Sequence, residues 1–153
     1  MSDNILIRRM TEDDKEAVLT MMRVFYDSPA VLHTSSDRVL ENDFEACVGV
    51  SPYLDGYIFD AAGVVAGYSM VARSYTTEYG GLCGWIEDLY IRPEYRGRGV
   101  AGQFFRALPG MYPEVVRFKL EVEPENEHAV EVYKSCGYSY LPYNIMEQVV
   151  KED

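Results

Sequence analysis

The hydrophobic pattern of this chain changes period near Tyr53, and this change constrains the fold more than any other feature of the sequence. Before that point, apolar residues from Ala17 to Phe25 recur at helical spacing, and Asp37 to Val48 predicts a second helix. After it, Tyr57 to Phe59 and Val64 to Val71 are β-rich runs, which predict a hairpin. The chain therefore changes from a helical to a β-rich segment near Tyr53.

The remaining elements are predicted from the same patterns. Thr11 to Asp14 has the form of a capping box before the first helix, and Ser28-Pro29 ends that helix. Ser74 to Gly81 carries turn residues. The other expected elements are strands at Asn4–Arg9, Trp85–Ile91 and Val115–Val122, helices at Gly99–Leu108 and Asn126–Ser135, and final strands near Tyr138 and at Asn144–Val150. The order β-α-α-β-β-β-α-β-α-β-β predicts an α/β (α+β) fold with a mixed sheet, antiparallel early and parallel across each helix crossover.

Length and charge limit the function classes. With 153 residues, 48% of them hydrophobic, we expect one domain over 1–153. The formal net charge of −11 repels a phosphate backbone, so nucleic acid is not expected as a partner. The chain shows no signal-peptide pattern and no run of ~18 apolar residues, which predicts a cytoplasmic protein with no membrane partner.

Cysteine and histidine usage argues against a metal site. The three cysteines are far apart and form no C-x-x-C, and the two histidines belong to no ligand cluster. We therefore expect no metal, a reducing compartment, and no histidine-based triad, since Gly-x-Ser-x-Gly is also absent.

One glycine-rich turn fits two motifs. Gly97-x-Gly99-x-x-Gly102 matches a dinucleotide fingerprint, with acidic residues ~20 positions on, and favours a dinucleotide-binding oxidoreductase. Two features oppose this interpretation. The preceding strand carries Glu87 and Asp88, which do not suit a strand buried between helices. Gly97 also comes six residues after the end of that strand, whereas the fingerprint requires a glycine immediately at the strand end.

The second frame of the same turn is Arg96-x-x-Gly99-x-Ala101. With its surroundings, IEDLYIRPEYRGRGVAGQFFRAL, it resembles the strand, phosphate loop and helix of the GCN5-related N-acetyltransferases, the GNAT family. Downstream, ENEHAVEVYKSCGY resembles that family's second motif, although Ala101 and Tyr138 replace the commoner glycine and phenylalanine. The resemblance implies a GNAT-like sheet splayed at an acetyl-CoA cleft, and direct attack of a primary amine on acetyl-CoA. A non-catalytic acyl-CoA-binding sensor of the same fold remains an alternative.

The turn is also a local anion site on physical grounds. Four of the 14 basic residues lie between Arg92 and Arg106, beside glycines and a helix N-terminus. The coenzyme A pyrophosphate would suit this site. The resemblance assigns cofactor contacts to Leu89, Tyr90 and Ile91 through their main chain, to Arg96, Gly97, Arg98, Gly99, Val100, Ala101 and Gly102, and to Asn126, which is also a plausible helix N-cap.

The resemblance implies that Tyr133 is the general acid and Glu87 the base. Tyr133 lies on one helical face with Asn126, and a phenol with a pKa near ~10 could protonate a leaving thiolate. On an alternating strand Glu87 and Asp88 face opposite sides unless a bulge intervenes. Glu87 is chosen because the Glu-Asp strand resembles that of polyamine and thialysine acetyltransferases.

The acceptor side is predicted from charge. The segment from Tyr26 and Asp27 to about Phe44 would form a lid, and its acidic residues favour a small cationic amine. Tyr26 and Asp27 are the expected substrate-binding residues. Edge strands near the C-terminus make a homodimer the expected assembly.

Overall fold

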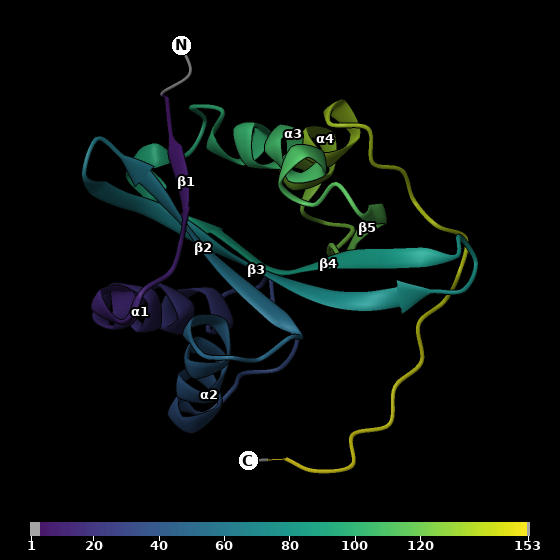
Figure 1. Ribbon diagram of the computed structural model, residues 1–153, viewed down its shortest axis with the longest axis horizontal. Helices are drawn as coiled ribbons and strands as arrows, with labels where there is room; N and C mark the ends of the chain where they lie inside the picture. The colour runs from purple at the N-terminus through teal and green to yellow at the C-terminus, as the bar shows by residue number, and fades with distance from the viewer. Residues whose placement is uncertain (1–3, 153) are drawn as a thin grey trace.

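The computed structural model describes residues 4–152 and contains a five-stranded sheet with a pair of helices on each face (Figure 1). In chain order the elements are β1 (Leu6–Arg9), α1 (Lys15–Tyr26), α2 (Asp37–Val48), β2 (Leu54–Ala61), β3 (Val64–Thr76), β4 (Gly81–Ile91), α3 (Val100–Met111), β5 (Val115–Leu120) and α4 (Glu127–Ser135). Short 3₁₀ turns at Glu12–Asp14 and Pro93–Tyr95 precede α1 and α3. The mixed α/β class predicted from the sequence is confirmed.

The strands lie in the order in which they occur along the chain. β1 to β4 are joined antiparallel, and β5 adds to β4 in parallel after the α3 crossover. The β3–β4 hairpin is longer than the sequence suggested, because Ser74 to Thr76 and Gly81 to Gly84 are paired rather than in a turn. Backbone pairing overrides the turn preference of these residues.

Each face of the sheet has its own core. α1 and α2 bury Met21, Met22 and Phe44 against Ile58 and Tyr68 of the sheet. α3 and α4 cover the opposite face, where Phe104, Phe105 and Leu108 of α3 are almost fully buried. The helical spacing of these apolar residues explains why each helix packs through one stripe.

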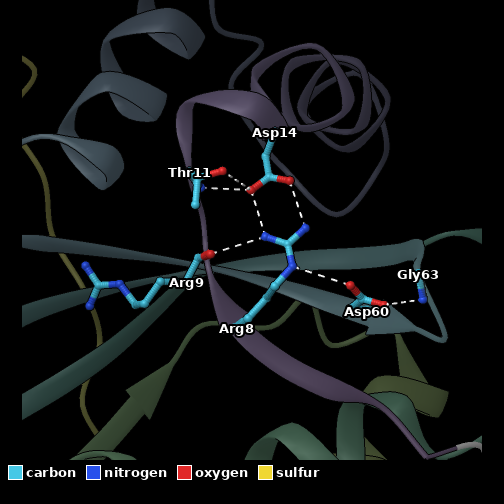
Figure 2. Close-up of polar contacts among 6 residues, drawn as sticks. All are labelled: Arg8, Arg9, Thr11, Asp14, Asp60 and Gly63. Atoms are coloured by element: carbon cyan, nitrogen blue, oxygen red, sulfur yellow. Dashed lines mark hydrogen bonds and ion pairs between the residues drawn. The ribbon is translucent and has the colours of Figure 1, made fainter.

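β1 is tied to the start of α1 and to the β2–β3 turn by one arginine (Figure 2). Arg8 donates two hydrogen bonds of 2.9 Å to the Asp14 carboxylate and a third of 3.4 Å to Asp60. Asp14 also accepts the Thr11 backbone N–H at 2.8 Å, as the predicted capping box requires. The Arg8 guanidinium holds the pKa of Asp14 below its usual value.

The two predicted C-terminal strands are not formed. Residues 139–152 contain no helix or strand and run as an extended segment past the tip of the β3–β4 hairpin (Figure 1). A strand requires a hydrogen-bonding partner, and the rest of the described chain does not provide one for this segment. In residues 4–152 no helix is long and apolar enough to cross a membrane.

Candidate active site between β4, β5 and α4

A β-bulge in β4 sets the direction of its two carboxylates. Met70 of β3 is opposite Asp88 and Val71 is opposite Ile86, so Glu87 is an extra residue in β4. As a result Asp88 joins the core beneath α1 and α2, while Ile86 lies in the core beneath α3. Strict alternation would have placed both on one face.

The bulge named above as the exception to alternation is therefore present, so simple alternation does not decide the faces of Glu87 and Asp88. Asp88 raises the pKa of Glu87, and Glu87 in turn raises those of Asp43 on α2 and Tyr26 on α1. These mutual effects require the charges to lie near one another, since screening by water weakens charge effects steeply with distance. The bulge thus places Asp88 on the α1 and α2 side, while Glu87 lies near enough to affect Asp43 and also lines a groove with β5 and α4.

Asp88 is buried and fully hydrogen-bonded. Only 2% of the residue is exposed, and its carboxylate accepts the Tyr26 hydroxyl at 2.7 Å and the Tyr68 hydroxyl at 2.8 Å. Burial raises the pKa of Asp88 to about 6, although the two phenols oppose the shift. Asp88 thereby fixes Tyr26, the last residue of α1, at the Glu87 bulge.

Three carboxylates at this position have raised pKa values. Partial desolvation, followed by the charges of Asp88 and Glu121, raises the pKa of Glu87 above its ordinary value. Burial, followed by the charge of Glu87, raises the pKa of half-buried Asp43 to about 6. A carboxylate with a raised pKa is a better proton acceptor near neutral pH than an ordinary one. The cluster also favours a positively charged ligand.

Tyr133 lies on α4, half-buried against α3. Its ring meets Phe105 edge to face at 5.2 Å and lies 6.4 Å from Tyr138, and burial raises its pKa. Asn126 caps α4 by accepting the Ala129 N–H at 3.4 Å, so its structural role is confirmed. The cap orients the helix that carries Tyr133.

Glu87 and Tyr133 line the same groove, which has a volume of about 970 Å³. The groove runs along β5 and α4 and continues to the segment after Gly137. A carboxylate that can accept a proton and a phenol that can donate one therefore face a shared space. That arrangement suits a transfer in which one group is deprotonated while another leaves.

The edge of β4 beyond Ile86 is open on the side of β5. The parallel pairing runs from Leu82 opposite Val115 to Ile86 opposite Leu120, and within residues 4–152 no β5 residue pairs with Glu87 to Ile91. β3 pairs with Leu89 and Ile91 on the other edge. Main-chain groups on the open edge of this stretch are therefore available to an extended ligand.

The turn before α3 has the geometry of an anion site. Gly97 and Gly99 have φ angles of 75° and 78°, which glycine adopts without strain, and a Cβ at Gly97 would meet nothing within 4 Å. The Gly99 carbonyl accepts the Gln103 N–H at 3.0 Å, so the N–H groups of the first turn, from Val100 to Gly102, have no intrahelical partner. These donors and the helix dipole favour an anion.

The arginines of the turn have structural contacts as well. Arg96 donates from Nε to the Ile91 carbonyl at 2.8 Å and lies over the Tyr90 ring, which joins the turn to the end of β4. Arg98 lies over the Tyr95 ring. The Val100 side chain is buried in the core, so a ligand could meet only its backbone.

The two expected acceptor residues differ in their placement. Tyr26 reaches Asp88, whereas exposed Asp27 pairs with Arg23 on α1 at 3.1 Å. Sequence reasoning missed Tyr68 as a site residue, and it counted Asp43 only among the acidic residues of the lid segment, without placing it beside Glu87. Asp43 shares α2 with buried Phe44, but only the packing of α2 brings it to Glu87. In the described part of the chain, no group of three or more His, Cys, Asp or Glu side chains could hold a metal ion.

Two known acetyltransferases are similar to this chain in sequence. Thialysine N-epsilon-acetyltransferase of Sus scrofa is 28% identical over 144 residues, covering 88% of this chain and 84% of that protein. Spermine/spermidine N(1)-acetyltransferase of Bacillus subtilis (strain 168) is 24% identical over 155 residues, covering 97% of this chain and 99% of that protein.

Solved structures share the fold. A possible acetyltransferase from Clostridium difficile 630 superposes with a TM-score of 0.81 at 21% identity, covering 97% of this chain and 99% of that one. AAC(6')-Iy was solved with a bisubstrate analogue of coenzyme A and acetylneamine. It superposes with a TM-score of 0.78 at 20% identity, covering 96% of this chain and 99% of that one.

The dinucleotide interpretation of the glycine turn is excluded by the sheet. A dinucleotide-binding domain is built on a mostly parallel sheet, whereas here only β4 and β5 are parallel. The sequence model of the acetyltransferase (GNAT) family matches residues 18–138, from α1 through α4. This match covers most of the chain and shows that it belongs to the GNAT family of N-acetyltransferases.

Proposed function

We propose that this protein transfers the acetyl group of acetyl-CoA to a primary amine by direct attack within a ternary complex. The observation that carries the proposal is the shared groove of Glu87 and Tyr133, next to the open edge of β4. One N-acetyltransferase domain over 1–153, acting as a cytoplasmic homodimer, is part of the same proposal.

The residues at the α3 turn fit acetyl-CoA. Backbone N–H groups from Gly97 to Gly102 would hold the pyrophosphate, with Arg96 and Arg98 balancing its charge. Leu89, Tyr90 and Ile91 would pair with the pantetheine arm through the open edge of β4, and one of their N–H groups would polarise the thioester carbonyl. Asn126, the N-cap of α4, would contribute a further contact to the cofactor.

Glu87 would accept the proton of the bound ammonium, directly or through water. For a lysine-like amine with a pKa of about 10.4, deprotonation at pH 7 costs about 4 to 5 kcal/mol, at about 1.36 kcal/mol per pKa unit. The neutral nitrogen then attacks the thioester carbon, the carbon–sulfur bond breaks, and Tyr133 donates its proton to the departing sulfur. The nitrogen loses its second proton as the amide forms; this proton restores the Tyr133 phenol, and the proton on Glu87 passes to solvent.

A small cationic amine is the acceptor class that the charges support. Asp43, Glu87 and Asp88 surround the Tyr26 end of α1, and no salt bridge neutralises Asp43, Glu87 or Asp88 among the described residues. The two similar acetyltransferases are named for thialysine and for spermine and spermidine as acceptors. Tyr26 would line the acceptor position, and Asp27 would lie at its outer rim.

The test is a thiol-release assay with acetyl-CoA and four amines: spermidine, thialysine, an aminoglycoside, and glutamate as an acidic control. We expect turnover with at least one cationic amine and none with glutamate. Melting temperatures with acetyl-CoA, CoA, NAD and NADP provide a second readout, since a ligand at 100 times its dissociation constant adds ~2.7 kcal/mol of stability. Stabilisation by acetyl-CoA without turnover on any amine would favour the acyl-CoA sensor instead.

A further inference from the structure

A second cavity, of about 460 Å³, lies on the outer half of the β3–β4 hairpin. The hairpin extends beyond the helices on both faces of the sheet (Figure 1), and the cavity walls come from β3, β4, β5, the β3–β4 connection and the segment after α4. Hydroxyl-bearing and basic side chains are frequent in these walls, and they include Ser74, Thr76, Thr77, Tyr143, Arg117 and Lys119. Because both kinds of side chain donate hydrogen bonds, the cavity has the chemistry of an anion site.

Lys119 supplies the unbalanced positive charge of this cavity. Its Nζ lies 4.5 Å from the centroid of the Trp85 ring, and it makes no hydrogen bond or ion pair to another described residue. Arg117, in contrast, pairs with Glu78 at 2.9 Å and donates to the Thr76 hydroxyl at 2.9 Å. An ammonium has three donors, and contact with one ring face leaves some of them for another partner. Lys119 can therefore bind an anionic group.

The cavity adjoins the groove that contains Glu87. Gly84 and Phe118 face the core beneath α3, since a Cβ at Gly84 would lie 2.8 Å from the Phe118 ring. Their neighbours Trp85 and Lys119 pair across β4 and β5 and, by alternation, face the opposite side of the sheet. Trp85 and Lys119 line both the cavity and the groove. The two spaces therefore share a wall, and one ligand could reach from Glu87 to Lys119.

The cofactor does not account for this positive charge. The anion site for the coenzyme A pyrophosphate lies beyond Ile91, at the C-terminal end of β4, whereas Lys119 is paired with Trp85. These two positions on β4 are about 20 Å apart, at about 3.3 Å per residue. Coenzyme A carries its phosphates at the end away from its thiol, so its reacting end brings no anion to Lys119. An anion at Lys119 would therefore belong to the acceptor.

The spacing of the two charges sets the length of the acceptor. Glu87 follows Trp85 by two positions on β4, a rise of about 7 Å, and the Lys119 ammonium lies against the Trp85 ring. Extended 6-aminohexanoate holds its nitrogen and its carboxylate carbon about 7 to 8 Å apart, at about 1.25 Å per bond. A molecule of this length would place its ammonium at Glu87 and its carboxylate at Lys119, with its methylene groups along the indole.

We propose that the acceptor is a dipolar amine, whose ammonium lies at Glu87 while its carboxylate is bound by Lys119 beside Trp85. The role of the ammonium nitrogen as the reacting atom rests on the proposed acetyl transfer, whereas the binding of the two charged ends does not. Polyamines should be poorer acceptors, because Lys119 would repel their second ammonium. Glutamate should be rejected, because the carboxylate directly beside its amine would face Glu87.

The test compares 6-aminohexanoate with its neutral isostere 6-aminohexanamide and with the dication 1,5-diaminopentane in the thiol-release assay. We expect the parent to favour the carboxylate over the amide by about 10- to 100-fold in kcat/KM, the range for a hydrogen bond to a charged group. Lys119→Gln should remove this preference, and Lys119→Glu should make 1,5-diaminopentane the best of the three. Because each preference is a ratio within one protein, partial misfolding of a variant does not change it.

The matched control is Lys15→Gln, which removes the same charge from α1. Lys15 pairs with Glu45 at 3.3 Å and lines neither the cavity nor the groove. The preferences of this variant should equal those of the parent. A parent that does not favour the carboxylate over the amide, or a preference that survives in Lys119→Gln, would overturn the dipolar acceptor.

Calorimetry tests the dipolar site without turnover, in the presence of CoA, which has no acetyl group to transfer. We expect 6-aminohexanoate to bind the parent more tightly than 6-aminohexanamide does, and Lys119→Gln to abolish the difference. If that difference is found but no amine releases thiol from acetyl-CoA, the acetyl transfer fails and the dipolar site stands. If amines are acetylated but neither assay shows the preference, the dipolar site fails and the acetyl transfer stands.

Discussion

Replacing Glu87 by Gln should reduce turnover most strongly near pH 7. At that pH only about one lysine-like amine in 2,500 is neutral, since the pH lies ~3.4 units below its pKa. The base can therefore raise the rate at pH 7 by at most ~10³-fold. We expect Glu87→Gln to lower kcat/KM at that pH by a factor of ~10² to ~10³. As the pH approaches the amine's pKa, solvent supplies the neutral form and the deficit should shrink up to ~tenfold per pH unit.

Glu121→Gln is a better control for Glu87→Gln than a substitution of the neighbouring Asp88. Asp88→Asn would disturb the hydrogen bonds that hold Tyr26 and Tyr68, so it should also impair the enzyme. Glu121→Gln instead removes one charge that raises the pKa of Glu87 and leaves the base in place. The acid limb of the pH–rate profile of Glu121→Gln should move to lower pH, and the rate at the pH optimum should change little. A Glu87→Gln deficit that stays constant from pH 7 to pH 10 would refute the base assignment.

Three further outcomes follow from the structure. Tyr133→Phe should lower kcat ~10²-fold with little change in acetyl-CoA affinity measured by calorimetry, because the phenol acts only as sulfur charge develops; unchanged kinetics would return it to a packing role. Gly99→Glu should abolish acetyl-CoA binding in a thermal-shift assay, because it places a side chain at a φ of 78° and a negative charge at the anion site; binding as tight as the parent's would contradict that site. Arg8→Met should lower the free energy of unfolding, measured in urea at pH 7, by about 2 kcal/mol, because it leaves the nearly buried carboxylate of Asp14 unpaired. This value lies between those typical of surface and of buried ion pairs. Since the folded pKa of Asp14 is depressed, this loss should be complete above pH ~4 and should fade as the pH falls through the folded value; a loss independent of pH would contradict it.

Local signals in the sequence predicted most elements correctly. The helix over Asp37–Val48 has the predicted bounds, and the capping box at Thr11 and Asp14 forms as expected. The helix predicted from Gly99 begins at Val100, with Gly99 as its N-cap. These features depend on residues within a few positions of one another, so the sequence contains all the information they need.

The bulge at Glu87 was not predictable in this way. It arises from the register between β3 and β4, over which Met70 and Val71 skip one residue of the partner strand. The motif therefore identified the pair of carboxylates, but not the bulge that sets their directions. Asp43 joins them from α2, more than forty residues earlier in the chain, through packing alone.

The C-terminal segment, residues 139–152, also separates what the local sequence determines from what tertiary contacts decide. The pattern of Asn144–Val150 determined that this segment favours a strand, because side-chain alternation is a property of the segment itself. Whether a strand forms depends on which edge lies beside it, and only the tertiary structure showed that its own chain leaves the segment unpaired while β5 remains open. Periodicity, caps and turns are decided by near neighbours, whereas register and edge pairing are decided by backbone groups that the fold brings together from far apart in the chain.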